Sequence, residues 1–185
     1  MATTAIHCTA GNHAGPRSQR GLEVYPTPAR AVEDLLRVEA LPPVCWEACG
    51  EEDSAIASVL RAHGRHVICN DIASDGVDFR DRTEAPHGVQ IVVTNPPFSM
   101  AGAFVQHGLT LVRRVIVLER IQFLESQTRG ALFDAGKLAR VHVFRRRLPR
   151  MHRADWTGKR ASGAMALCWF VFDNDHRGPP TLDWI

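Results

Sequence analysis

The stretch "IVVTNPPFSM", residues 91–100, decides how the rest of the chain is interpreted. Its first four residues are β-branched and predict a buried strand. The strand has to end at Asn95, because the two prolines that follow cannot donate a hydrogen bond to a neighbouring strand. The sequence therefore places a side-chain amide, two prolines and Phe98 directly at the end of a buried strand.

Outward from this stretch, predicted strands alternate with predicted helices. This pattern is typical of an α/β protein whose mostly parallel sheet has helices on both faces. In such sheets ligands bind beyond the carboxyl ends of the strands, so residues 47–53, Asp71 and residues 95–98 are candidate sites. The predicted strands lie within "VCWEACG" (44–50), "RHVICNDI" (65–72), "VQIVVTN" (89–95), "RVIVLE" (114–119), "ARVHVFRRR" (139–147) and "AMALCWFVFD" (164–173).

The ends of two predicted helices carry capping signals. Thr27 is suited to cap the first helix, with Pro28 at its first helical position. Ser54 is suited to cap the second helix, and Gly64 to close it. The predicted helices lie within "YPTPARAVEDLLRVEAL" (25–41), "AIASVLRAH" (55–63), "AGAFVQHGLTLV" (101–112) and "FLESQTRGALFDAG" (123–136).

Length and composition favour one domain in a chain of 185 residues. Residues 1–21 show no apolar period and predict a flexible arm, which leaves residues 22–185 as a single domain. The five cysteines form no CxxC pair and no signal-peptide pattern is present, so we expect reduced thiols in a cytoplasmic protein. The longest apolar stretch is interrupted by Arg113 and Arg114, and we expect no transmembrane segment.

Charge is distributed unevenly along the chain. Residues 1–112 carry 8 basic and 13 acidic side chains, whereas residues 113–172 carry 13 basic and 4 acidic ones. Such an excess is what a protein that binds a polyanion shows, although an ordinary solvated surface explains it equally well. The histidines have no metal-ligand spacing, so we expect no metal site.

The residues after the central strand suit the recognition of an exocyclic amine on a base. Such an amine is a weak nucleophile because its lone pair is delocalised into the ring, and acceptors for its two N–H groups activate it. Asn95 supplies a side-chain carbonyl, and Pro96 supplies a backbone carbonyl whose position is restricted by its own ring and by Pro97. Phe98 supplies an aromatic face on which a base can stack.

The Asn-Pro-Pro-Phe tetrad resembles the motif of S-adenosylmethionine-dependent methyltransferases that modify amino or amide nitrogens. "YPTP" (25–28), "WEACGE" (46–51), Asp71 and "GVDF" (76–79) accompany it in the order of the N6-adenine DNA methyltransferases. Over residues 23–185 the chain resembles small phage- and prophage-type members of that family, which lack a separate target-recognition domain.

This resemblance implies a Rossmann-like class I methyltransferase fold with an antiparallel late strand. It also implies S-adenosyl-L-methionine as cofactor and methyl transfer to the N6 amine of adenine in double-stranded DNA, with the target base flipped out of the helix. The residues implied in catalysis are Asn95, Pro96, Pro97 and Phe98. The residues implied in cofactor binding are Tyr25, Thr27, Pro28, Glu47, Cys49, Gly50, Asp71, Ile72, Asp78, Phe79 and Asn95.

Individual roles follow from the same resemblance. The segment with Tyr25 and Thr27 would lie against the methionine end of the cofactor. Asp71 would bind the ribose hydroxyls, Asp78 would accept a hydrogen bond from the adenine amine of the cofactor, and Phe79 would pack on the adenine ring.

The loop at residues 47–53 departs from the family pattern. Family members commonly read Glu-Pro-Ala-x-Gly-x-Gly, whereas this chain reads Glu-Ala-Cys-Gly-Glu-Glu-Asp. The proline is absent, and Glu52 stands where the second glycine is expected. Its side chain either turns out to solvent or stands in the cofactor site, and we expect weak cofactor binding that Glu52→Gly tightens.

The segment "FRRRLPRMHRADWTGKRASG" (144–163) joins the last two predicted strands. Alternate residues of a strand point to the same face, so Arg145 and Arg147 would share one face. An arginine-rich hairpin with an aromatic residue suits phosphate contact plus stacking or insertion, although a solubilising loop remains an alternative. The residues expected to contact DNA are Arg145, Arg147, Arg150, Arg153, Trp156, Lys159 and Arg160.

Two other functions are compatible with the sequence. One is methyl transfer to another planar nitrogen, such as an RNA base or a protein amide. The other is a non-catalytic DNA-binding relative whose altered loop has lost the cofactor.

Overall fold

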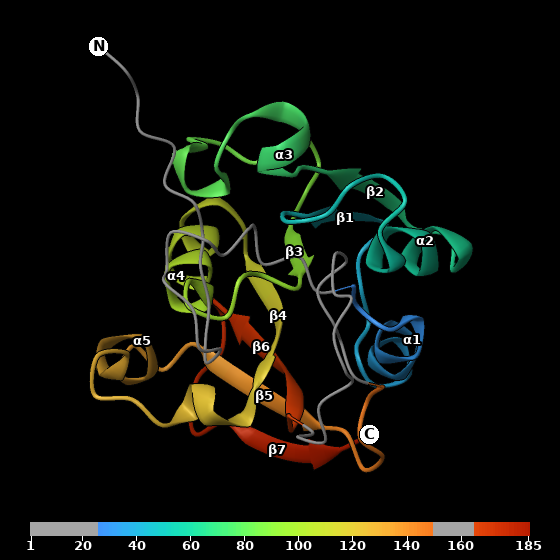
Figure 1. Cartoon of the computed structure of the whole chain (residues 1–185). Helices are drawn as coiled ribbons and strands as arrows, with labels where there is room; N and C mark the ends of the chain where they lie inside the picture. The colour runs from blue at the N-terminus through green and yellow to red at the C-terminus, as the bar shows by residue number, and fades with distance from the viewer. Residues whose placement is uncertain (1–25, 150–164) are drawn as a thin grey trace, which may run out of the picture.

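The computed structural model describes residues 26–149 and 165–185, and Figure 1 shows their arrangement. Within these residues, seven strands form one mixed sheet in the order β2-β1-β3-β4-β6-β5-β7. The expected arm at residues 1–21 lies outside the described residues. The helices are α1 (Ala29–Val38), α2 (Ala55–Ala62), α3 (Ile72–Asp75), α4 (Ala101–Leu111) and α5 (Gly130–Asp134), with 3-10 helices η2 (Phe79–Asp81) and η3 (Ile121–Leu124). The strands are β1 (Val44–Glu47), β2 (His66–Cys69), β3 (Ile91–Thr94), β4 (Arg114–Arg120), β5 (Leu138–Val143), β6 (Leu167–Asp173) and β7 (Thr181–Trp184).

The strand directions confirm the expected α/β protein with a mostly parallel sheet. β2, β1, β3 and β4 run parallel to one another. β6 is antiparallel to both β4 and β5, and β7 is parallel to β5, so β6 alone is reversed among the described strands. The carboxyl ends of the other strands therefore lie at one edge of the sheet, which we call the carboxyl edge.

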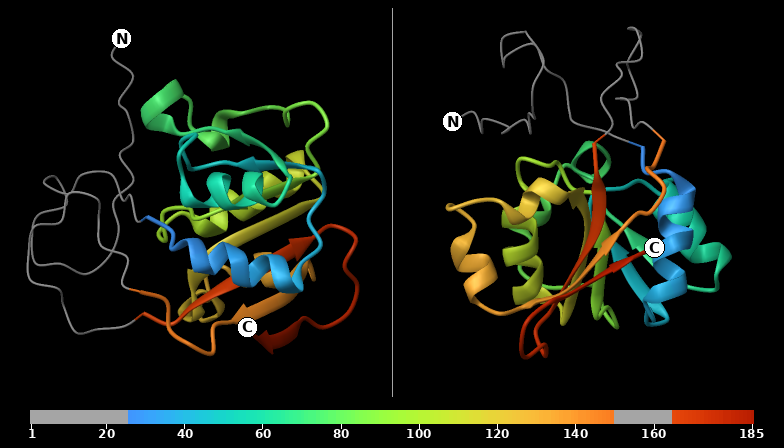
Figure 2. Two further views of the ribbon diagram at one scale, coloured as in Figure 1. Left: turned by 90° about the vertical axis from the view of Figure 1, so that its right-hand side faces the viewer. Right: turned by 90° about the horizontal axis from the view of Figure 1, so that it is seen from below.

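Helices cover both faces of the sheet (Figure 2). Alternate residues of a strand point to opposite faces, and β3 shows the result clearly. Ile91 and Val93 pack in the core beneath α1 and α2, whereas Val92 packs in the core beneath α4. This double burial explains why β3 is apolar at every position until it reaches Thr94 and Asn95.

The capping predictions are correct for α2 and wrong for α1. Ser54 accepts a hydrogen bond from the backbone amide of Ala57 over 3.1 Å. Gly64, with φ of 77°, follows α2 in the left-handed conformation that suits a helix end. The N-cap of α1 is Pro28 rather than Thr27. The hydroxyl of Thr27 instead accepts a hydrogen bond from Asn95.

A buried carboxylate anchors α1 to the sheet. Glu39, directly after α1, accepts hydrogen bonds from Arg140, from His142 over 2.8 Å and from Arg114 over 3.2 Å. Burial acts to raise the pKa of Glu39, but the hydrogen bonds and charges of His142 and Arg140 outweigh burial and lower it to about 2. These contacts fix α1, and with it Thr27, above the sheet.

Two features near the C-terminus differ from the sequence prediction. One helix was expected over residues 123–136, but η3 and α5 are separate short helices. Arg129 explains the break, because its side chain donates to the backbone carbonyls of Phe123 and Gln122. β7 was not predicted: its apolar residues Leu182 and Trp184 alternate with polar ones, but the run is short and all four of its residues are exposed.

Three further properties concern the described residues as a group. No helix in the described ranges is long and apolar enough to span a membrane. Among these residues, no disulfide joins the cysteines and no group of three histidine, cysteine or acidic side chains is arranged to hold a metal ion.

β5 and β6 form a hairpin whose connection lies at the carboxyl edge. Val143 of β5 pairs with Cys168 of β6 at that edge. The chain between them, residues 144–167, therefore leaves and rejoins the sheet on the same side as the end of β3. Its central part, residues 150–164, lies outside the described residues.

Candidate active site

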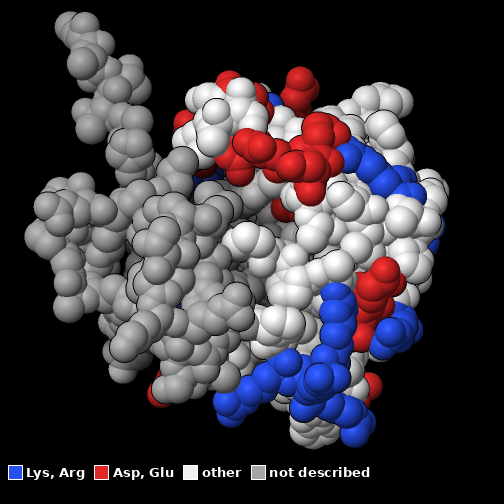
Figure 3. All heavy atoms as spheres, turned by 45° about the vertical axis from the view of Figure 1, so that its right-hand side comes forward, with Lys and Arg blue, Asp and Glu red and all other residues white. Residues whose placement is uncertain are grey.

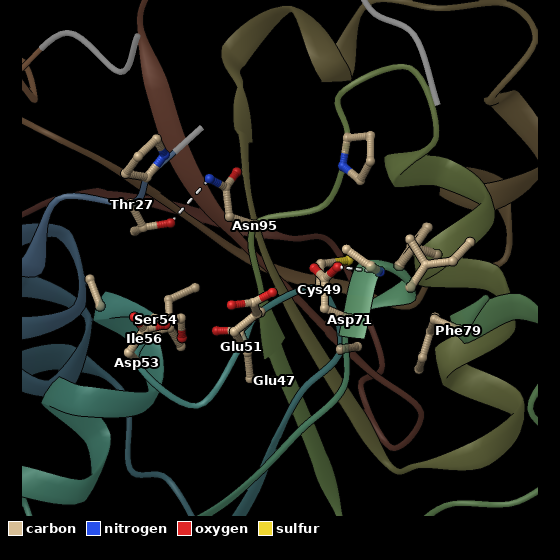
Figure 4. Close-up of a pocket in the computed structure, with 18 of the residues that line it drawn as sticks. Thr27, Glu47, Cys49, Glu51, Asp53, Ser54, Ile56, Asp71, Phe79 and Asn95 are labelled. Atoms are coloured by element: carbon tan, nitrogen blue, oxygen red, sulfur yellow. Dashed lines mark hydrogen bonds between the residues drawn. The ribbon is translucent and has the colours of Figure 1, made fainter. Parts of the chain in front are cut away.

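A cavity of about 590 Å³ lies at the carboxyl edge, beyond the ends of β1 and β3 (Figure 4). The chain runs from β1 to β2 on one side and then to β3 on the other side of β1. In α/β sheets such a change of direction creates a crevice in which ligands bind. The cavity volume lies within the range of small-molecule sites, roughly 300–1,000 Å³.

Most of the predicted cofactor residues line this cavity, although they come from four separate parts of the chain. Pro28 does not line it, and Tyr25 lies outside the described residues. The predicted residues that do line it are Thr27, Glu47, Cys49, Gly50, Asp71, Ile72, Asp78, Phe79 and Asn95.

The loop after β1 is shaped by close packing between Gly50 and Glu47. A Cβ atom on Gly50 would lie 2.6 Å from Cγ of Glu47, closer than Cβ atoms approach, and would make a tight contact of 3.1 Å with Cβ of Ser54. The backbone amide of Gly50 also donates to the carbonyl of Asn70 over 3.2 Å, which joins the loop to the end of β2. Only glycine fits here, because of space and not because of a positive φ.

The altered position of the loop, Glu52, does not occupy the cavity. Its side chain is 75% exposed, forms an ion pair with Arg61 and is absent from the cavity wall. Its neighbours Glu51 and Asp53 do line the cavity. Of the two orientations considered from the sequence, the structure has the one in which Glu52 faces solvent.

The space-filling view shows acidic side chains gathered on one part of this face and basic ones on another (Figure 3).

Glu47 is a buried carboxyl group at the floor of the cavity. It is 1% exposed, and its Oε1 accepts a hydrogen bond from the hydroxyl of Thr94 over 2.8 Å. Oε2 accepts no hydrogen bond within the described residues. Burial raises the pKa of Glu47 to about 8, and the negative charge of Asp71 acts in the same direction. A positively charged ligand in the cavity would reverse this effect and favour the ionised form.

The wall across the cavity from Asn95 is formed by Asp71, Asp78 and Phe79. Asp71 caps α3, because its Oδ1 accepts a hydrogen bond from the backbone amide of Ala73 over 2.8 Å. Both oxygens of Asp78 accept hydrogen bonds from the Arg80 guanidinium, which lowers the pKa of Asp78. The ring of Phe79 stacks on Phe104, with 5.1 Å between ring centroids.

Asn95 lies at the other side of the cavity, close to the start of α1. Its Nδ2 donates a hydrogen bond to the hydroxyl of Thr27 over 3.0 Å. In Figure 4 the amide nitrogen points toward Thr27, and the side-chain carbonyl points away from Glu47 and Glu51. The contact with Thr27 holds the side chain of Asn95 beside the start of α1.

The rest of the tetrad takes different positions. Pro97 lines the cavity, and its carbonyl accepts the backbone amide of Met100 over 2.8 Å. Pro96 is buried and does not line it. Phe98 is 6% exposed and lies off the cavity wall, with the guanidinium of Arg120 over its ring at 4.9 Å from the centroid. The structure therefore does not present Phe98 as an open stacking surface.

The predicted DNA-binding residues fall into two groups. Arg145 and Arg147 are exposed and follow β5 at the carboxyl edge. Three strand spacings separate β5 from β3, which amounts to about 15 Å across the sheet. The others, Arg150, Arg153, Trp156, Lys159 and Arg160, lie outside the described residues.

Sequence reasoning missed several residues of the site. Glu51, Asp53 and Phe104 line the cavity, and Arg120 covers Phe98. Glu51 and Asp53 lie within the loop that was recognised, so their acidic character was a usable signal. Nothing in the sequence pairs Arg120 with Phe98, because that contact depends on β3 and β4 lying side by side.

The chemistry of the cavity selects for a particular type of ligand. Five described lining residues are acidic, and no lysine or arginine is among the described lining residues. The cavity therefore favours a ligand that carries positive charge and hydroxyl groups, with an apolar or aromatic part that contacts Phe79 and Ile72.

No protein-family model matches the chain, and no curated protein matches it.

Proposed function

We propose that the protein is an S-adenosylmethionine-dependent methyltransferase that modifies the N6 amine of adenine in DNA. One observation carries the proposal: a single cavity joins Asp71, Asp78 and Phe79, on one side, to Asn95 on the other. The strand order, with its change of direction beside β1 and its one reversed strand among those described, supports a Rossmann-like class I methyltransferase fold.

The cavity suits S-adenosylmethionine. The ammonium and sulfonium groups of this molecule are cations, and Glu51 and Asp53 of the loop provide a matching negative field, while the charge of the ligand would favour the ionised form of Glu47. The orphaned Oε2 of Glu47 is a buried acceptor at the cavity floor. Asp71 would bind the ribose hydroxyls, and Asp78 would hold the adenine against the part of the wall that Phe79 lines. When bound, S-adenosylmethionine supplies an electrophilic methyl group.

The protein's own contribution to the reaction is positioning. Asn95, held by Thr27, would accept one N–H of the target amine with its side-chain carbonyl. The backbone acceptor for the second N–H would be the carbonyl of Pro96, which follows Asn95 directly although it does not line the cofactor cavity. Two acceptors would draw electron density toward the amine nitrogen and align its lone pair for an in-line attack.

DNA is the favoured substrate because basic residues lie at the same edge as the cavity. A base inside a duplex cannot reach the cavity, so the target nucleotide has to be flipped out at a cost of a few kcal/mol. Arg145 and Arg147, about 15 Å from β3 across the sheet, would hold the phosphates of the duplex meanwhile.

The proposal is tested by incubating the protein with radiolabelled S-adenosylmethionine and, separately, with unmethylated DNA, RNA and protein. Label in DNA at N6 of adenine is the expected result. Label in RNA or protein would assign another planar nitrogen as the substrate. Cofactor binding without transfer to any of them would favour a binding protein.

Asn95→Ala provides the site-specific arm of this test. We expect it to abolish transfer and to leave cofactor affinity within a few-fold, because the lost carbonyl serves the target amine. Gln90→Ala is the matched control, since Gln90 is an exposed amide just before the other end of β3. A transfer rate that survives Asn95→Ala would remove the proposed role.

A further inference from the structure

The aromatic ring of the Asn-Pro-Pro-Phe tetrad is covered by a planar cation. The Cζ atom of Arg120 lies 4.9 Å from the centroid of the Phe98 ring. Phe98 is 6% exposed, so no ligand can stack on it until a neighbour moves. The side chain of Arg120 is 37% exposed, which makes it a neighbour that can move without opening the core.

The fold places Arg120 on this ring through the pairing of β3 with β4. Arg120 is the last residue of β4, and Phe98 follows the end of β3 by four residues. Leu118, two residues before Arg120 and on the same face of β4, packs in the same core as Phe98. The contact therefore lies at the carboxyl edge, beside Asn95.

A buried carboxylate holds Arg120 from the other side. Glu119 is 1% exposed and accepts a hydrogen bond from the backbone amide of Arg120. Its Oε2 also lies 3.7 Å from Nε of Arg120. The guanidinium thus lies close to both an aromatic face and a carboxyl group, contacts in which arginine stacks well.

We propose that Arg120 occupies the position of the target base in the free protein and exchanges with that base when substrate binds. The inference rests on the proposed function and adds a residue to the target site that the tetrad does not include. A guanidinium and a purine are both flat and both stack on a phenyl ring, so they compete for one face. Once displaced, the cation stays at the carboxyl edge, where a DNA phosphate can bind it.

The competition can be observed directly by NMR. The Nε–Hε signal of Arg120, assigned by its loss in Arg120→Lys, should show a ring-current shift in the free protein that Phe98→Leu removes. Titration with a single-stranded oligonucleotide of deoxyadenosines should move the signal to the position of a solvated arginine. An abasic oligonucleotide of the same length keeps the phosphates and should leave the ring-current shift in place.

A binding measurement gives the energetic arm of the same test. The quantity to compare is the affinity for the deoxyadenosine oligonucleotide divided by the affinity for the abasic one. Arg120→Ala should raise this ratio by about two- to fivefold, which corresponds to the free energy of one exposed cation–π contact. Taking the ratio cancels any lost phosphate contact. Arg145→Ala is the control, because it should weaken both oligonucleotides equally and leave the ratio unchanged.

The outcomes separate this inference from the proposed function. Equal displacement by both oligonucleotides, or binding without displacement, would overturn the exchange even if methyl transfer to DNA is observed. If only the deoxyadenosine oligonucleotide displaces Arg120, the exchange is supported even when no methyl transfer is detected. In that case the proposed methyl transfer, and not the exchange, is wrong.

Discussion

The side-chain amide of Asn95 donates a hydrogen bond to the hydroxyl of Thr27 over 3.0 Å, although the two residues are 68 positions apart in the sequence. The start of α1 thus orients the amide at the end of β3. This contact explains why Thr27 does not cap the helix, since its hydroxyl serves the site instead of the backbone of α1.

Removing the hydroxyl of Thr27 should slow methyl transfer. Thr27→Val keeps the shape of the side chain but removes the hydroxyl that accepts a hydrogen bond from Asn95, at a cost of about 0.5–1.5 kcal/mol, or roughly two- to tenfold in rate. Thr27→Ser retains the hydroxyl and should retain most of the rate. Steady-state kinetics on DNA would check both, and equal rates for the two variants would show that the contact does not matter.

Gly50→Ala should impair cofactor binding, whereas Glu52→Gly should not change it. The added methyl group of Gly50→Ala would meet Cγ of Glu47 at 2.6 Å and has to displace that side chain or the loop. Glu52 faces solvent, so the tightening expected from the sequence for Glu52→Gly is withdrawn. Calorimetry with S-adenosylmethionine measures both, and tighter binding by Glu52→Gly would contradict the observed loop conformation.

The buried Glu47 should make the free protein less stable as the pH rises. Its pKa is raised from 4.5 to about 8 by burial, so the folded state holds the proton more tightly than the unfolded state does. Its contribution is most favourable below pH 4.5 and is lost between pH 4.5 and about 8. The loss amounts to about 1.4 kcal/mol in the free energy of unfolding per pH unit.

Urea denaturation at a series of pH values checks this. Glu119, whose pKa is raised to about 7 by burial, contributes a slope of the same sign. Glu47→Gln should therefore flatten the pH dependence only in part. Glu51→Gln is the control, because Glu51 is exposed and should leave the slope as it is. An unchanged slope in Glu47→Gln would mean that this carboxyl is already ionised in the fold.

Two arginines at the carboxyl edge should contribute to the salt dependence of DNA binding. Arg145→Ala combined with Arg147→Ala should lower the slope of log affinity against log salt by about 2 if each residue neutralises one phosphate. Arg177→Ala is the matched control, because Arg177 is exposed and follows β6 at the opposite edge of the sheet. Fluorescence anisotropy at several salt concentrations measures the slopes, and equal slopes would assign the pair to solubility.

The sequence was informative where residues act locally. The apolar run before Asn95 and the capping signals at Ser54 and Gly64 predicted their elements, since burial on two faces and helix capping leave a mark on adjacent residues. Of the acidic and aromatic residues that line the cavity, Glu47 and Asp71 were found because they end or follow a predicted strand, and Asp78 and Phe79 were found through the family resemblance.

The errors concern contacts between distant segments. Thr27 was expected to cap its own helix, but its hydroxyl bonds a residue on another element. Phe98 was expected to be open to a base, but Arg120 from the neighbouring strand covers it. The helix expected over residues 123–136 is interrupted because Arg129 folds back onto the preceding carbonyls. The first two contacts join residues far apart in the sequence, and the contacts of Arg129 are with nearby backbone carbonyls, which no side-chain pattern marks.

The hairpin of β5 and β6 has a consequence for how such a protein can diversify. Val143 and Cys168 are paired neighbours, so a connection of any length between them begins and ends at the same place in the sheet. Closing a longer loop there costs little, about 0.6 kcal/mol for each doubling of its length. Under the proposed function, recognition of a new DNA sequence would therefore require exchange of this one insert only, while the strands that build the cavity stay unchanged.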